Sequence, residues 1–247
     1  MLYTLKDTAR VEKIFHGWEE TLIYSCLQQV MGTLYVSDLE NPRSAMAHLG
    51  SFVFFAGDPN EELVLNKPDR FVFMIPQDER WAVLIESCFP SADKVIRYAI
   101  KKNTRFQRED LEHIAAGLPE GYKIRRIDAD LYDMCLQEGF SRDFVQEFVS
   151  KEQYVKIGRG YVVLKDGKIV SGASSYSRYL NGIEIEVNTT ENEKRKGLAG
   201  VACATLILDC LNEGLYPSWD AATMISVHLA EKFGYEFSHE YVCYVLE

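Results

Sequence analysis

A charged run, one glycine and a long apolar stretch follow one another within residues 191–211. The run Lys194-Arg195-Lys196 precedes Gly197, and the spacing predicts an apolar helix from Leu198 to Glu213. The first turn of such a helix exposes backbone N–H groups that have no partner inside the helix, and the helix dipole is positive there. Three basic side chains at this end are unfavourable unless an anion binds. The pattern predicts a phosphate-binding loop, and the alternative is a solvated charge run before a core helix.

The strand predicted before this loop, residues 182–189, carries a second candidate group. Apolar and polar residues alternate along it, which places Glu184 and Glu186 on one face. Neighbouring carboxylates raise the pKa of one member and attract a cation, so the pair suits acid–base chemistry. The alternative is a solvent-facing row of glutamates on a half-exposed strand.

Composition excludes several classes of protein. The chain has 247 residues, of which 47% are apolar, and a net charge of −10, which argues against a nucleic-acid surface. No apolar run approaches the roughly 18 residues that a membrane helix needs, so we expect no membrane partner. The N-terminus lacks the pattern of a signal peptide, and the six scattered cysteines predict neither a zinc site nor a disulfide framework. A cytoplasmic protein is expected.

A predicted boundary divides the chain into two domains. Two glycines and a proline in residues 117–121 end a helical pattern, so we expect domains at 1–121 and 122–247. The first domain is predicted to be mixed α/β, with strand-like runs that include residues 80–87. The second begins with a strand at 122–127, followed by helices at 129–138 and 142–150, and a hairpin across Asp166-Gly167.

The loop resembles the acyl-CoA pyrophosphate loop of the GCN5-related N-acetyltransferases, usually written [RQ]-x-x-G-x-[GA]. Here it reads Lys194-Arg195-Lys196-Gly197-Leu198-Ala199. The strand and helix order of residues 122–247 is also similar to that fold, and the stretch from Tyr216 to Tyr235 is similar to a bacterial subgroup that includes the zwittermicin-resistance type. The resemblance implies an α/β (α+β) acyltransferase fold, a mixed and mostly antiparallel sheet flanked by helices, preceded by a smaller mixed α/β domain.

The resemblance also implies an activity: transfer of an acetyl group from acetyl-CoA to the amine of a small molecule, such as an antibiotic or a metabolite. It assigns acetyl-CoA binding to the end of the strand, the loop and one later helix position. These residues are Val187, Asn188, Thr189, Lys194, Arg195, Lys196, Gly197, Leu198, Ala199, Gly200 and Ser226.

For the proton taken from the amine, Glu186 is the favoured base because it lies nearer the loop, and Glu184 is the second candidate. The general acid stays open, because the tyrosine that many relatives use falls at Ala230 and the usual asparagine falls at Thr223. Other tyrosines near the predicted cleft are candidates: Tyr176, Tyr179, Tyr235, Tyr241 and Tyr244. A non-catalytic acyl-CoA sensor and a structural protein are the alternative functions.

Overall fold

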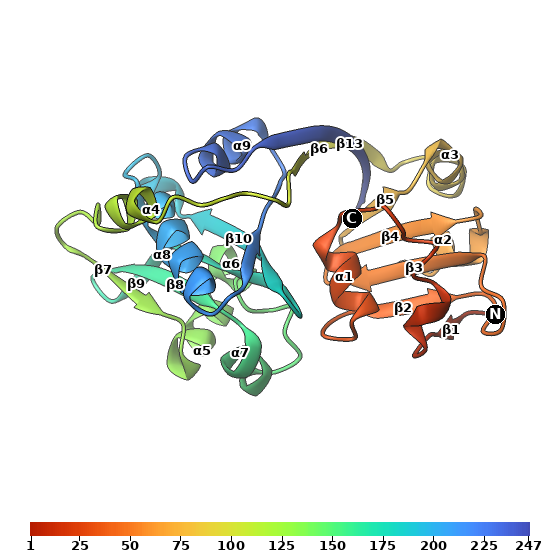
Figure 1. Cartoon of the computed structure of the whole chain (residues 1–247), viewed down its shortest axis with the longest axis horizontal. Helices are drawn as coiled ribbons and strands as arrows, with labels where there is room; N and C mark the ends of the chain where they lie inside the picture. Colours follow the sequence, from red (N-terminus) through yellow and green to blue (C-terminus); the bar gives the residue numbers. More distant parts are fainter. The chain divides into compact units, whose positions relative to one another are not determined.

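The computed structural model describes residues 1–247, which form two compact units. The first unit contains Met1–Tyr98 together with His239–Glu247, and the second contains Ala99–Ser238. Each unit has helices packed on a mixed sheet (Figure 1), which confirms the predicted α/β class. No helix of the structure has both the length and the apolar composition needed to cross a membrane.

The first unit is built on a mixed sheet in which the strands follow the order β1-β2-β3-β4-β5-β13-β6, and the two-residue strand β12 (Asp220–Ala221) is the last strand beside β6. Its strands and helices are β1 (Tyr3–Thr4), η1 (Thr8–Arg10), α1 (Thr21–Leu27), β2 (Thr33–Val36), β3 (Ser44–Leu49), β4 (Phe52–Gly57), α2 (Glu61–Leu65), β5 (Val72–Pro76), α3 (Glu79–Cys88), β6 (Asp93–Ile100) and β13 (Phe237–Leu246). Strands β4 and β5 are parallel, whereas β13 pairs antiparallel with β5 and brings Tyr244 opposite Met74 in the core.

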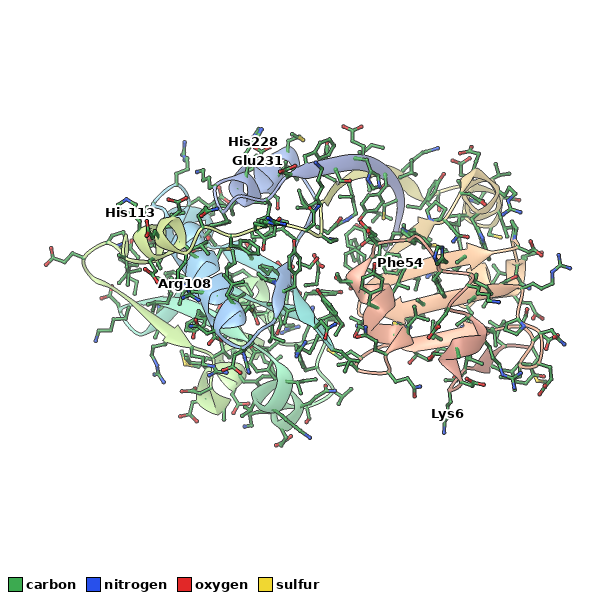
Figure 2. The ribbon with its side chains drawn as sticks, viewed as in Figure 1. Lys6, Phe54, Arg108, His113, His228 and Glu231 are labelled. Atoms are coloured by element: carbon green, nitrogen blue, oxygen red, sulfur yellow. The ribbon has the colours of Figure 1, made fainter.

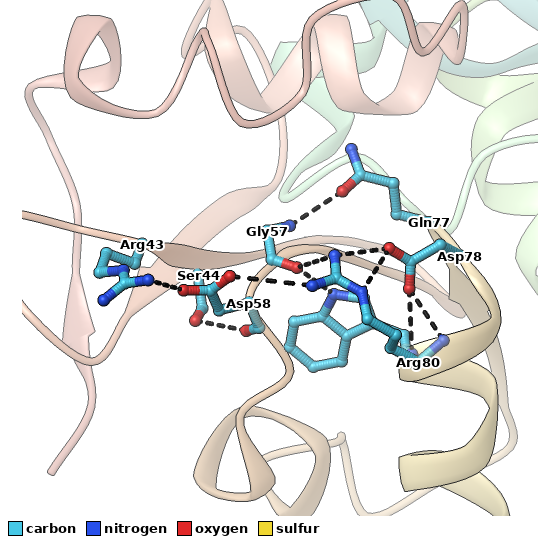
Figure 3. A network of polar contacts seen from close by, with 8 residues as sticks. Arg43, Ser44, Gly57, Asp58, Gln77, Asp78 and Arg80 are labelled. Carbon is cyan, nitrogen blue, oxygen red and sulfur yellow. Dashed lines mark hydrogen bonds and ion pairs between the residues drawn. The ribbon is translucent and has the colours of Figure 1, made fainter.

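A polar network fixes the end of β4 in the first unit (Figure 3). Gly57 has φ +84°, and a Cβ there would lie 2.1 Å from the carbonyl oxygen of Arg43, so only glycine fits. Its carbonyl accepts a hydrogen bond from Trp81 Nε1 at 2.9 Å, and its N–H donates to Gln77 Oε1 at 2.9 Å. These contacts join β4 to the start of α3, where Asp78 caps the helix.

The second unit is built on a five-stranded sheet of order β11-β10-β9-β8-β7. Its strands and helices are α4 (Arg108–Ala115), β7 (Tyr122–Arg126), α5 (Ala129–Gln137), α6 (Gly139–Arg142), α7 (Lys151–Ile157), β8 (Gly160–Lys165), β9 (Lys168–Tyr179), β10 (Gly182–Thr189), η2 (Glu191–Glu193), α8 (Leu198–Asn212), β11 (Tyr216–Ser218), β12 (Asp220–Ala221) and α9 (Met224–Glu231). Strands β7 to β10 are antiparallel to their neighbours, and β11 is parallel to β10.

The apolar helix α8 packs on this sheet against β8, β9 and β10, and α4 packs on α8 (Figure 1). Leu198, Val201, Leu206 and Ile207 of α8 are all buried, as the apolar sequence predicts. Arg108 of α4, labelled in Figure 2, donates a hydrogen bond of 2.8 Å to Asn212 Oδ1 at the end of α8.

The division between the units differs from the boundary predicted at residue 121. Helix α4 precedes that position, yet it belongs to the second unit because its buried face packs on α8. Phe106 likewise packs on Tyr235, with ring centroids 5.1 Å apart. Conversely, the last strand residues belong to the first unit, where β13 completes the sheet beside β5.

Two predicted elements were wrong. Residues 80–87 form helix α3 rather than a strand, because Asp78 accepts hydrogen bonds from the N–H groups of Arg80 and Trp81 and starts a helix. The helix predicted at 142–150 is also displaced. Residues 139–142 form α6, and α7 begins after Ser150, whose hydroxyl accepts the N–H of Gln153 at 3.2 Å.

Candidate functional site

Strands β10 and β11 of the second unit separate after a short paired stretch. They pair over three positions only, of which the last joins Glu184 to Ser218. Beyond this point β10 continues to Thr189 and stays paired with β9, whereas the chain after Ser218 leaves the five-stranded sheet. One edge of β10 from Ile185 to Thr189 therefore has no strand partner, and its backbone groups are available to an extended ligand.

The loop from β10 leads directly to the N-terminus of α8. Gly197 is the N-cap residue with φ +81°, no side chain caps the helix, and its first turn has no acidic residue. A Cβ at Gly197 would meet no atom within 4 Å, so the space above the helix end is open. The N–H groups of Leu198, Ala199 and Gly200 have no intrahelical acceptor, which is the arrangement that binds a phosphate.

Most of the positive charge of the loop is already paired. Lys194 Nζ lies 2.6 Å from Glu191, and Lys196 Nζ lies 2.8 Å from Glu193. Arg195, with φ +63°, is exposed and makes no ion pair or hydrogen bond. In the free chain Lys194 and Lys196 are thus paired within the loop, and Arg195 is the basic side chain of the run that forms no ion pair.

Glu193 is the residue that sequence reasoning missed. Its carboxylate accepts hydrogen bonds from Lys196, from Tyr122 Oη and from Lys165 at 2.9 Å. These donors, led by Lys196, lower the pKa of Glu193 to about 2. Because Tyr122 and Lys165 are opposite one another on β7 and β8, the carboxylate ties the loop to the sheet. The only signal in the sequence was the spacing of Glu193 and Lys196, an i, i+3 pair.

The predicted face of β10 is present, but it is not a row of solvated glutamates. Glu184 is only 5% exposed, and Glu186 is half-buried. Asn188 lies on the same face and donates to the carbonyl oxygen of Phe140 in α6 at 3.2 Å, so α6 covers this face. Thr189 Oγ1 is 2.7 Å from Ser171 Oγ on β9.

The candidate acids are mostly committed to other contacts. Tyr235 Oη donates to the carbonyl of Pro217, and burial raises its pKa well above the ordinary value. Tyr241 and Tyr244 belong to the first unit, where Tyr244 Oη donates to Glu86 at 2.6 Å. Tyr176 and Tyr179 are buried on β9. Ala230, which is fully buried, offers no hydroxyl.

The later helix position, Ser226, lies in the first turn of α9. Its hydroxyl accepts a hydrogen bond from Trp219 Nε1 at 3.1 Å, and its N–H donates to Thr223 Oγ1 at 3.3 Å. Thr223 is therefore the N-cap of α9. Trp219 is 1% exposed and packs beside Phe233, so its main role is in the core.

Comparison with known proteins gives one consistent result. The sequence profile of the GNAT acetyltransferase family matches residues 12–244. The chain is 27% identical over 240 residues to an uncharacterized N-acetyltransferase, YdfB, of Bacillus subtilis strain 168, covering 91% of this chain and 89% of that protein.

Solved structures agree. A GCN5-related N-acetyltransferase-like protein from Streptococcus suis 89/1591 is 42% identical, covers 97% of this chain and 98% of its own, and superposes with a TM-score of 0.92. A GCN5-related N-acetyltransferase from Kribbella flavida has a TM-score of 0.55 at 14% identity, covering 90% of this chain and 93% of its own, and shares the fold.

Proposed function

Because the chain belongs to the GNAT acetyltransferase family, we propose that it transfers an acetyl group from acetyl-CoA to the amine of a small molecule. The observation that carries this proposal is the fork between β10 and β11 beside the uncapped N-terminus of α8. An unpaired strand edge suits an extended amide-containing arm, and the helix end suits a pyrophosphate. Acetyl-CoA contains both groups and supplies the activated acetyl thioester.

The residues present fit this molecule. The backbone of Val187, Asn188 and Thr189 offers hydrogen bonds along the free edge of β10. The loop from Lys194 to Gly200 offers N–H groups, the Arg195 guanidinium and the open space above Gly197. Ser226 is proposed to contact the cofactor from the first turn of α9, and its hydroxyl accepts a hydrogen bond from Trp219 Nε1.

Acetyl transfer forms a C–N bond and breaks a C–S bond, and one proton must leave the amine. We assign Glu186 as the base that takes this proton, because its half-buried carboxylate is on the strand that leads to the cofactor loop. Glu184, two residues earlier on the same face, adds a second negative charge that attracts the ammonium form of the acceptor. A backbone N–H on the free edge of β10 would stabilise the thioester oxygen as negative charge develops.

The acceptor is proposed to be small and cationic, in keeping with the net charge of −10 and the two glutamates. All six cysteines are free thiols, which supports a reducing compartment such as the cytoplasm.

A non-catalytic acyl-CoA sensor is the second candidate, and a specific observation favours it. The family resemblance puts Ala230 where many relatives have a tyrosine, and Tyr235, Tyr241 and Tyr244 form hydrogen bonds elsewhere. A sensor would bind CoA and release no thiol.

The test combines binding with turnover. Calorimetry with CoA measures whether the chain binds it, and a ligand at 100 times its dissociation constant should stabilise the folded state by about 2.7 kcal/mol. Thiol release from acetyl-CoA is then followed with a panel of primary amines: putrescine, tyramine, glucosamine and lysine. Binding with turnover supports the transferase, binding without turnover supports the sensor, and no binding at millimolar CoA rejects both.

A further inference from the structure

Strand β9 carries four fully buried serines, and three of them are hydrogen-bonded. Ser171 Oγ is 2.7 Å from Thr189 Oγ1, and Ser174 Oγ donates to the carbonyl of Phe144 at 2.7 Å. Ser175 Oγ accepts the N–H of Arg159 at 3.0 Å. Ser177 is the exception, since its hydroxyl is fully buried and has no hydrogen-bond partner in the protein.

Ser218 on β11 has the same property: its side chain is 0% exposed, and its hydroxyl has no partner. Buried hydroxyls without a partner are rare, and they point to an ordered water or a ligand group beside them.

The two serines lie on either side of one carboxylate. Glu184 on β10 is paired with Ser177 on β9, at the last position before a β-bulge, and with Ser218 on β11. Side chains at directly opposite positions point to the same face of a sheet, with Cβ atoms about 4.5–5.5 Å apart in an antiparallel pair. Ser177, Glu184 and Ser218 therefore form a polar row across three strands, and this row lies where β10 and β11 separate.

Resting on the proposed acetyl transfer, we propose that Ser177 and Ser218 are positioning residues, each holding a water molecule against the Glu184 carboxylate. A hydroxyl both donates and accepts, and an ionised carboxylate only accepts, so a water between them can satisfy both groups. The carboxylate is then held from both neighbouring strands in the orientation that attracts the acceptor ammonium. The two serines therefore affect the binding of the acceptor amine and not the chemical step.

The test uses Ser177→Ala and Ser218→Ala in the full chain, assayed with the amine of the panel that gives the highest turnover. We expect each variant to raise the KM of that amine about threefold to tenfold and to leave kcat nearly unchanged, as expected for loss of a water-mediated contact made equally in ground and transition states. Adding Ser177→Ala to Glu184→Gln should raise KM no further, because both changes remove one interaction. An unchanged KM in either alanine variant would show that the serine replaced does not position the Glu184 carboxylate.

Ser175→Ala is the matched control on the same strand. Ser175 is paired with Ile185, so it points to the other face of the sheet, and its hydroxyl accepts the N–H of Arg159 within the protein. Its removal should lower the melting temperature and leave KM unchanged. Ser177→Ala removes no bond within the protein, so its melting temperature should stay close to that of the wild type. If Ser175→Ala and Ser177→Ala raise KM equally, the effect comes from general disturbance of β9 and the proposal fails.

A high-resolution crystal structure of the ligand-free wild-type chain gives a readout that is independent of activity. We expect ordered water within hydrogen-bond distance of Glu184 and each of the two serine hydroxyls, and loss of one water in each alanine variant. Absence of both waters overturns the proposal. If instead the waters are present and no amine of the panel is acetylated, the serines hold the carboxylate as inferred and the proposed function is what fails.

Discussion

The Nζ atom of Lys196 lies 2.8 Å from the carboxylate of Glu193, three residues before it. The same carboxylate also accepts hydrogen bonds from Lys165 Nζ and from the hydroxyl of Tyr122, which lie on two strands of the sheet. The loop that precedes α8 is therefore held in shape by residues of this chain, without a ligand. Such preorganisation reduces the entropy lost when an anion binds at the helix end.

The first prediction concerns pH and stability. The pKa of Glu193 is about 2 in the folded chain and 4.5 at its ordinary value. A lowered pKa stabilises the fold fully above the ordinary value, and this contribution is lost as pH falls from about 4.5 towards 2. Glu193→Gln should lower the melting temperature at pH 7, and the difference from wild type should shrink below about pH 4.5. Scanning calorimetry from pH 7 to 3 measures the difference in melting temperature between the two proteins. A difference that does not change with pH would contradict the lowered pKa of Glu193.

The second prediction separates the basic residues of the loop. Arg195 forms no hydrogen bond or ion pair and acts on Glu191 only through its charge, whereas Lys194 forms an ion pair with Glu191. Arg195→Gln should weaken CoA binding about threefold to tenfold, in keeping with one exposed charge-assisted contact. Lys194→Gln should have a smaller effect, and added salt should reduce the difference between the variants. Titration calorimetry with CoA decides this, and equal losses would mean that the pairing seen in the free chain does not persist.

The third prediction uses two side chains of the same size at Gly197. Its φ of +81° strains most residues, but aspartate and asparagine tolerate this region best. Gly197→Asp places a negative charge where the phosphate must lie, and Gly197→Asn places the same bulk without charge. We expect the Gly197→Asp variant to bind CoA at least about tenfold more weakly than the Gly197→Asn variant. Equal affinities in two folded variants would place the phosphate elsewhere.

Much of this site could be predicted from local sequence. The glycine before an apolar run predicted where α8 begins. Strict alternation of apolar and polar residues predicted that Glu184 and Glu186 share one face of β10. Asp166 and Gly167 gave the hairpin, since both adopt the positive φ that such a turn needs.

The remaining features depend on contacts between distant residues. Tyr122 and Lys165 reach Glu193 only because β7 and β8 pair, and nothing in the loop itself reveals them. The unit boundary depends on the packing of α4 on α8. The glycines and the proline that follow α4 in the sequence end the helix, but they do not mark the boundary between the units. The composition of residues 80–87 fits a strand or a helix, and the N-cap at Asp78 favours the helix that the structure has.

The last prediction tests the catalytic assignment. Glu186→Gln keeps the size of the side chain and loses its ability to take a proton. Turnover should fall by about 10²- to 10⁴-fold, the usual contribution of a positioned general base, while the affinity for CoA stays unchanged. The loss should shrink at high pH, where the free amine no longer needs a base. Steady-state kinetics over a pH range, with calorimetry for CoA, measure both quantities.

Glu184→Gln is the matched control, one carboxylate earlier on the same face of β10. It should act mainly on the KM of the amine, since it removes a charge that attracts the acceptor. If both variants keep wild-type turnover across the pH range, the proton leaves through water or another residue. The two carboxylates would then serve acceptor binding alone, and the chemistry would depend on the fork and the helix end.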